Sequence, residues 1–74
     1  MFKLGGKMNE INLKNNLKDI RIKNNMSQES LAQMVGTSRQ TIIAIEKNIF
    51  CPTAKLAFLL CTALDVKFEE LFYV

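Results

Sequence analysis

Histidine and tryptophan are absent from this chain of 74 residues, proline occurs once and glycine three times. Without histidine the chain lacks the usual general base at neutral pH and the commonest metal ligand in proteins. It has no glycine-rich phosphate loop, and its adjacent carboxylates, Glu69 and Glu70, suit the start of a helix. We therefore expect no enzyme, no metal and no cofactor, and nothing in the sequence points to a small-molecule ligand.

Cysteine is also scarce. The two cysteines, Cys51 and Cys61, fit neither a disulfide framework nor a zinc site. Cys61 falls inside a predicted helix, where we expect a small buried thiol. Cys51 falls in a predicted loop beside Pro52, where an inert thiol and a thiol accessible to oxidants are both open alternatives.

Long apolar runs are lacking too. The longest, residues 56–64, is about half as long as a membrane-spanning helix. The first eight residues lack the apolar centre of a secretory signal, so we expect a cytoplasmic protein with no membrane contact. Residues 1–10 show no periodicity and are expected to be disordered or a leader segment. Our hypothesis is that Met8 is the native start; a natural N-terminus at Met1 would refute it.

The residues that are present suit one small helical domain, which we place at residues 11–74. Apolar residues make up 49% of the chain, and most of its ten Lys and Arg residues precede residue 40. This asymmetry suits a nucleic-acid face on one side and an assembly face on the other. Helical spacing predicts five helices, which begin near residues 16, 28, 39, 54 and 68.

Helix boundaries are marked by capping residues. Ser27, Ser38 and Thr53 stand where N-caps are needed, whereas Lys67 replaces the usual capping hydroxyl, which predicts fraying of the last helix. The alternation in residues 11–13 predicts a short strand that could pair with the C-terminal residues as a two-stranded ribbon. Helix ends are predicted at residues that adopt the left-handed conformation readily, namely Asn24, Asn25, Gly36 and Asn48.

Residues 28–47 meet the demands of a helix-turn-helix unit. Two helices that cross steeply need a small residue at their contact, which Ala32 supplies, and Gly36 gives the short turn its backbone freedom. The second helix of such a unit presents its N-terminal residues to the major groove of DNA. The apolar residues spaced to meet in one core are Leu31, Val35, Ile42 and Ile45.

Four stretches, SQESLA (27–32), GTSRQTI (36–42), IEKN (45–48) and PT (52–53), resemble the Cro/repressor-type (XRE) helix-turn-helix regulators of bacteria and phages. The resemblance covers about residues 16–72. It implies an all-α fold, a compact five-helix domain of the lambda-repressor type. It also implies that the protein binds an approximately palindromic operator in double-stranded DNA as a homodimer.

Geometry and the resemblance together select the residues expected to contact DNA. Arg39 and Gln40 begin the recognition helix, residues 38–47, where arginine can pair with guanine and glutamine with adenine. Ser38 and Thr41 are near enough for base contacts, and Ala44 can offer a methyl group to thymine. The residues expected to contact phosphate are Ser27, Gln28, Thr37, Lys47 and Asn48.

Some of these residues have a second interpretation. Ser27 and Ser38 could be N-caps only, Arg39 a solvated charge and Lys47 exposed surface. For Arg21 the resemblance favours a structural role, because a helix-one arginine in this family typically pairs with a glutamate near the end of the recognition helix. It therefore implies a partly buried ion pair between Arg21 and Glu46.

The C-terminal part is more apolar than the family pattern. Phe58 and Leu59 cannot both face the core, and the chain ends on Phe72, Tyr73 and Val74. Ordinary apolar surface is one interpretation. The one we favour is a dimer contact, built from Phe58, Leu59, Leu71 and Tyr73.

Sequence-specific binding of double-stranded DNA by a dimeric transcriptional regulator, most often a repressor, is thus the expected function. The alternative is a protein-interaction module, such as an antitoxin or anti-repressor partner, that acts through the apolar C-terminal face. Salt-dependent DNA binding that is lost when Arg39 and Gln40 become alanine would distinguish the two.

Overall fold

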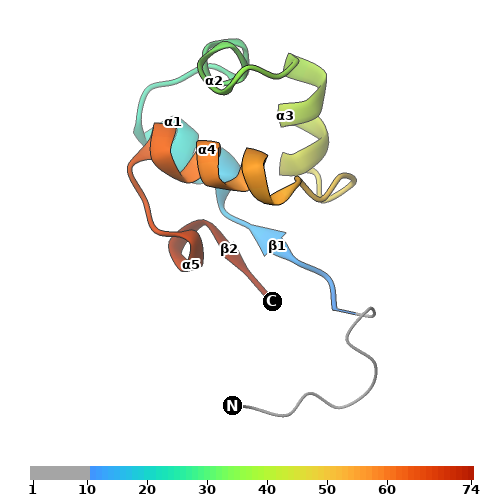
Figure 1. Ribbon diagram of the computed structural model, residues 1–74. Helices are drawn as coiled ribbons and strands as arrows, with labels where there is room; N and C mark the ends of the chain where they lie inside the picture. The colour runs from blue at the N-terminus through green and yellow to red at the C-terminus, as the bar shows by residue number, and fades with distance from the viewer. Residues whose placement is uncertain (1–10) are drawn as a thin grey trace.

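A computed structural model describes residues 11–74, so the expected leader segment, residues 1–10, lies outside the described residues. Two short strands and five helices make up the described part (Figure 1). This confirms the predicted all-α, five-helix fold with a short ribbon. The helices are α1 (Leu17–Lys23), α2 (Gln28–Val35), α3 (Arg39–Glu46), α4 (Ala54–Leu64) and α5 (Phe68–Leu71); the strands are β1 (Lys14–Asn15) and β2 (Phe72–Tyr73).

The ribbon forms, but not where the alternation placed it. β1 pairs antiparallel with β2, with Lys14 opposite Tyr73 and Asn15 opposite Phe72. The prediction of a strand at residues 11–13 is therefore wrong. β2 follows directly after α5, and the Asn16 N–H donates to the Leu71 carbonyl oxygen at 2.8 Å. This bond fixes the pairing next to the start of α1, which alternation of side chains cannot indicate.

The caps explain why the helices begin and end at these residues. The hydroxyls of Ser27, Ser38 and Thr53 each accept a backbone N–H in the first turn of α2, α3 and α4, as predicted. At α5 the Lys67 side chain has no acceptor to offer. Glu70 Oε1 instead accepts the Lys67 N–H at 3.0 Å, so this end of α5 is capped without a hydroxyl.

Left-handed residues end four of the helices or begin the turns after them. Gly36, at φ 78°, ends α2 and begins the short turn to α3. Asn25 and Asn48 adopt the same backbone region after α1 and α3, and Asp65 adopts it at the end of α4. Asparagine and aspartate tolerate this conformation better than other residues with a side chain.

The core lies where α2, α3 and α4 meet, with α1 and α5 closing it (Figure 1). Ala32 is almost fully buried where α2 packs against α3, as a close helix crossing requires. None of the helices in residues 11–74 is long and apolar enough to cross a membrane. The largest fully buried side chains are Leu17, Leu31, Ile42, Ile45, Leu60 and Leu71.

Candidate nucleic-acid interface

The N-terminal end of α3 presents polar side chains to solvent. Arg39 and Gln40 are both exposed, whereas Ile42 and Ile45, on the other side of the helix, are fully buried. Ala44, one turn after Gln40, is half-buried. The buried side fixes the rotation of α3, so the two polar side chains are held outward by packing and not by contacts of their own.

Two hydroxyls at the start of α3 bind each other. Ser38 Oγ accepts the Thr41 N–H at 3.1 Å, and the Ser38 and Thr41 hydroxyls lie 2.9 Å apart in a hydrogen bond. One hydroxyl hydrogen supplies that bond, which leaves the other free for a further acceptor. Ser38 is therefore an N-cap that has capacity left for a contact with DNA.

The start of α2 lies against the end of α3. Gln28 is half-buried, and its Nε2 donates to Glu46 Oε1 at 3.1 Å. Ser27 Oγ accepts the Ser30 N–H at 2.9 Å and donates to Ser30 Oγ at 3.0 Å. Thr37, in the turn between the helices, is half-buried. The Gln28 side chain is thus already held in place, with one amide hydrogen still free.

Arg21 and Glu46, the pair expected to be structural, are bonded to each other. Arg21 Nε donates to Glu46 Oε2 at 2.7 Å, and the two side chains are 10% and 5% exposed. Arg21 Nη1 also donates to the Met26 carbonyl oxygen at 2.8 Å. Because Glu46 also accepts from Gln28, one carboxylate connects α1, α2 and α3. The arrangement holds the two helices of the unit at a fixed angle.

Lys47 and Asn48, both exposed, follow the end of α3. A residue that the sequence interpretation missed lies beside them. Asn15, in β1, donates through Nδ2 to the Ile45 carbonyl oxygen at 2.9 Å and to Asn48 Oδ1 at 3.1 Å. No local pattern indicates these two bonds, because both partners lie about thirty residues away in the chain.

The predicted dimer residues do not share one face. Phe58 is 69% exposed and Tyr73 is 45% exposed, but Leu71 is fully buried in the core. The assignment of Leu71 to an interface is therefore wrong, because α5 turns this side chain inward beneath α4. Leu59 is half-buried and lines a hollow with Gly36 and Thr37 beside the α2–α3 turn, away from Phe58.

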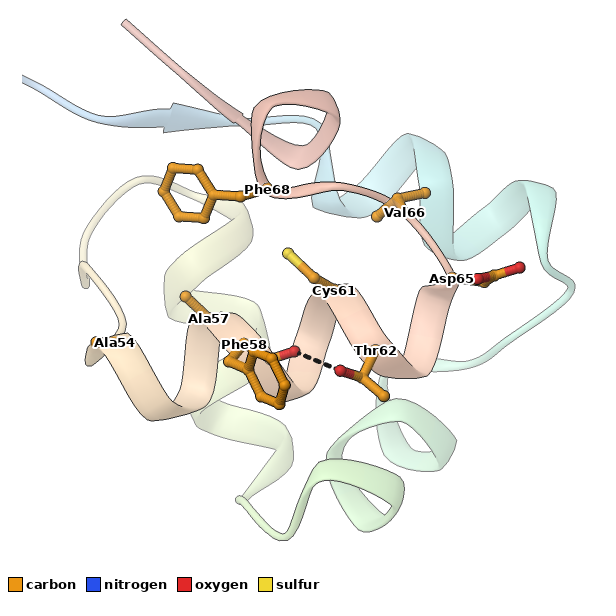
Figure 2. Close-up of a pocket in the computed structure, with 8 residues that line it drawn as sticks. All are labelled: Ala54, Ala57, Phe58, Cys61, Thr62, Asp65, Val66 and Phe68. Carbon is orange, nitrogen blue, oxygen red and sulfur yellow. Dashed lines mark hydrogen bonds between the residues drawn. The ribbon is translucent and has the colours of Figure 1, made fainter.

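An apolar groove runs between α4 and the start of α5 (Figure 2). Its volume is about 580 Å³, its floor includes Ala57 and Cys61, and Phe58 and Phe68 stand at its sides. Phe68 is 50% exposed and was not among the predicted interface residues. Burial raises the pKa of the Cys61 thiol, and the Glu69 carboxylate raises it further, so this thiol is protonated at neutral pH.

Comparison with known proteins identifies the fold and the family. A model of the helix-turn-helix family matches residues 17–71. The chain is 50% identical over 60 residues to an uncharacterised HTH-type transcriptional regulator of Methanocaldococcus jannaschii. The aligned part covers 81% of this chain and 91% of that protein. The chain is also 40% identical over 62 residues to an uncharacterised HTH-type transcriptional regulator of Bacillus subtilis. This alignment covers 84% of this chain and 94% of that protein.

Solved structures agree with this assignment. The restriction-modification controller protein C.AhdI from Aeromonas hydrophila aligns with a TM-score of 0.69 and 30% identity, over 73% of this chain and 82% of that one. A protein from Bacteroides fragilis has the same fold, with a TM-score of 0.76 and 21% identity. The alignment covers 82% of this chain and 98% of that one. The resemblance noted in the sequence is thus confirmed: the chain belongs to the XRE-type helix-turn-helix family of transcriptional regulators, which are DNA-binding proteins and not enzymes.

Proposed function

We propose that this chain binds an approximately palindromic operator in double-stranded DNA as a homodimer and represses transcription by occupying a promoter on the nucleoid. The observation that carries the proposal is the exposure of Arg39 and Gln40 at the start of a helix whose other side is fully buried. Helix-turn-helix proteins place this end of the recognition helix in the major groove. C.AhdI is a controller protein, which supports a regulatory role.

We assign recognition of the DNA base sequence to the first turns of α3. Arg39 can pair with N7 and O6 of guanine through two hydrogen bonds, and Gln40 with N6 and N7 of adenine. Ser38 and Thr41 share one free hydroxyl hydrogen for a base or phosphate oxygen. Ala44 offers a methyl group to thymine at the next turn.

Phosphate contacts surround this reading end. Gln28 keeps one amide hydrogen free beside the N-terminus of α2, where backbone N–H groups and the helix dipole favour an anion. Lys47 supplies a charge at the other end of α3. We assign phosphate contacts to Ser27, Gln28, Thr37, Lys47 and Asn48.

Binding to a duplex recovered by selection of the protein on random-sequence DNA tests the proposal. We expect tighter binding to that duplex than to a scrambled duplex of the same composition. Arg39 and Lys47 give a dimer four cations at the DNA. A plot of the logarithm of the association constant against the logarithm of the salt concentration should therefore have a slope of about −3 to −4. Equal affinity for both duplexes at every salt concentration would contradict sequence-specific binding.

The homodimer is proposed because one reading head covers only a few base pairs. Two heads related by a twofold axis and about 34 Å apart would read successive major grooves on one side of the duplex. The groove side of α4 and α5 supports such pairing, because Phe58 projects beside a hollow floored by Ala57 and Cys61. A projection and a hollow on the same face are what a twofold interface needs.

Replacing Phe58 by glutamate should convert the dimer into a monomer, because the interface would then have to bury a carboxylate. Sedimentation velocity at micromolar concentration measures this directly. Ile22→Glu is the matched control, because Ile22 is 53% exposed on α1 and does not line the groove. We expect this control to stay dimeric. Equal sedimentation of wild type and Phe58→Glu would exclude this face as the interface.

A further inference from the structure

The amide of Asn15 connects the terminal ribbon to the end of the recognition helix. Its Nδ2 donates to the Ile45 carbonyl oxygen at 2.9 Å and to Asn48 Oδ1 at 3.1 Å. Its Oδ1 accepts the Leu17 N–H at 3.0 Å. One half-buried side chain thus joins the start of α1, the last turn of α3 and the loop after it.

The two backbone partners of Asn15 determine the orientation of its side-chain amide. A backbone N–H only donates and a backbone carbonyl only accepts, so Oδ1 faces Leu17 and Nδ2 faces Ile45. The Asn48 side chain therefore faces the Asn15 Nδ2 donor with its own Oδ1, which accepts the hydrogen bond. The Nδ2 of Asn48, with two N–H groups, points away on an exposed side chain and donates to no group within residues 11–74.

Donors at this place suit a DNA phosphate. Glu46, the last residue of α3, comes seven positions after Arg39, which corresponds to about 10 Å along the helix, and Asn48 follows two residues beyond this end. The major groove is about 12 Å wide. When Arg39 lies at the base edges, the far end of α3 therefore reaches the phosphates that border the groove. A phosphate oxygen accepts hydrogen bonds and offers none, so only the Nδ2 side of Asn48 can bind it.

We propose that Asn15 is a positioning residue for DNA binding, which holds the Asn48 amide with its donors toward a backbone phosphate. The inference rests on the proposed function. It also gives the ribbon a part in DNA binding, because β1 carries Asn15 and its pairing with β2 holds β1 in place.

A double-mutant cycle tests the proposal on the full chain. The proteins are wild type, Asn15→Ala, Asn48→Ala and the double variant, and the probe is a duplex recovered by selection of the wild-type protein on random-sequence DNA. Binding is followed by fluorescence anisotropy at fixed salt. We expect Asn48→Ala to weaken binding about tenfold, Asn15→Ala about fivefold, and the double variant no more than Asn48→Ala alone.

A purely structural role for Asn15 would give a different result. Fivefold weakening by Asn15→Ala in the Asn48→Ala background as well would overturn the positioning role. If Asn15→Ala is unfolded by circular dichroism, Asn15→Asp replaces it, since it keeps the acceptor for Leu17 and removes the donor to Asn48. Asn15→Asp should then weaken binding more in the wild-type background than in the Asn48→Ala background, because repulsion between the added charge and DNA acts in both and the contact with Asn48 exists only in the first.

Failure of this inference and failure of the proposed function look different. Unchanged affinity of Asn48→Ala, together with a strong loss in the Arg39→Ala/Gln40→Ala variant, would overturn the inference and leave the proposed function standing. If the wild-type protein selects no duplex at all, the proposed function fails and the inference fails with it.

Discussion

Replacing Arg39 and Gln40 together by alanine lowers the affinity for the selected operator by about 100-fold or more, because each two-bond contact between a side chain and a base contributes about 1–3 kcal/mol. Affinity for unrelated DNA falls only several-fold, since each protomer loses a single positive charge. Fluorescence anisotropy with both duplexes at one salt concentration measures the two effects. Both side chains are exposed, so the stability of the fold should not change.

The control for this variant is Lys67→Ala, which removes one positive charge from the N-cap of α5, at the end of the molecule away from α2 and α3 (Figure 1). We expect it to keep both the affinity and the preference for the operator. An Arg39→Ala/Gln40→Ala protein that binds the operator as tightly as wild type would show that the recognition helix does not read the sequence.

The second large effect concerns stability. Arg21→Ala should lower the free energy of unfolding by about 3 kcal/mol or more, because it leaves the Glu46 carboxylate buried without its cation. The Met26 carbonyl loses a donor as well. Urea denaturation followed by circular dichroism gives the value. Lys23→Ala, an exposed change on the same helix, should cost less than about 0.5 kcal/mol.

A double replacement separates the cost of a buried charge from the loss of packing. Arg21→Met with Glu46→Leu removes both charges and keeps side chains of similar size, so it should be markedly more stable than Arg21→Ala. A loss below about 1 kcal/mol in Arg21→Ala would contradict the role assigned to the pair, because it would mean that Glu46 does not need this partner.

Features that depend on near neighbours in the chain were predictable from the sequence. The N-caps Ser27, Ser38 and Thr53 bind backbone groups three residues away, and Asn25, Gly36 and Asn48 adopt the left-handed conformation where helices had to end. These are local requirements that residue type alone satisfies. The resemblance to the family supplied the pairing of Arg21 with Glu46, which spacing could not.

Features set by contacts between distant parts of the chain were not predictable. The register of the ribbon depends on a bond between Asn16 and Leu71, and the role of Asn15 depends on Ile45 and Asn48. Leu71 lies in a helix of four residues, which is too short for periodicity to show which side is buried. The apolar groove was not predictable for the same reason. Its walls come from two helices, and a local sequence pattern does not indicate how they pack against each other.

Under the proposed function, α3 reads DNA sequence as one half of a twofold pair. The most direct measurement is repeated selection of the wild-type protein on a library of random duplex DNA, followed by sequencing. We predict an approximately palindromic motif whose half-sites have centres about one helical turn apart, with guanine or adenine at the positions read by Arg39 and Gln40. A recovered pool with no enriched motif would contradict the claim.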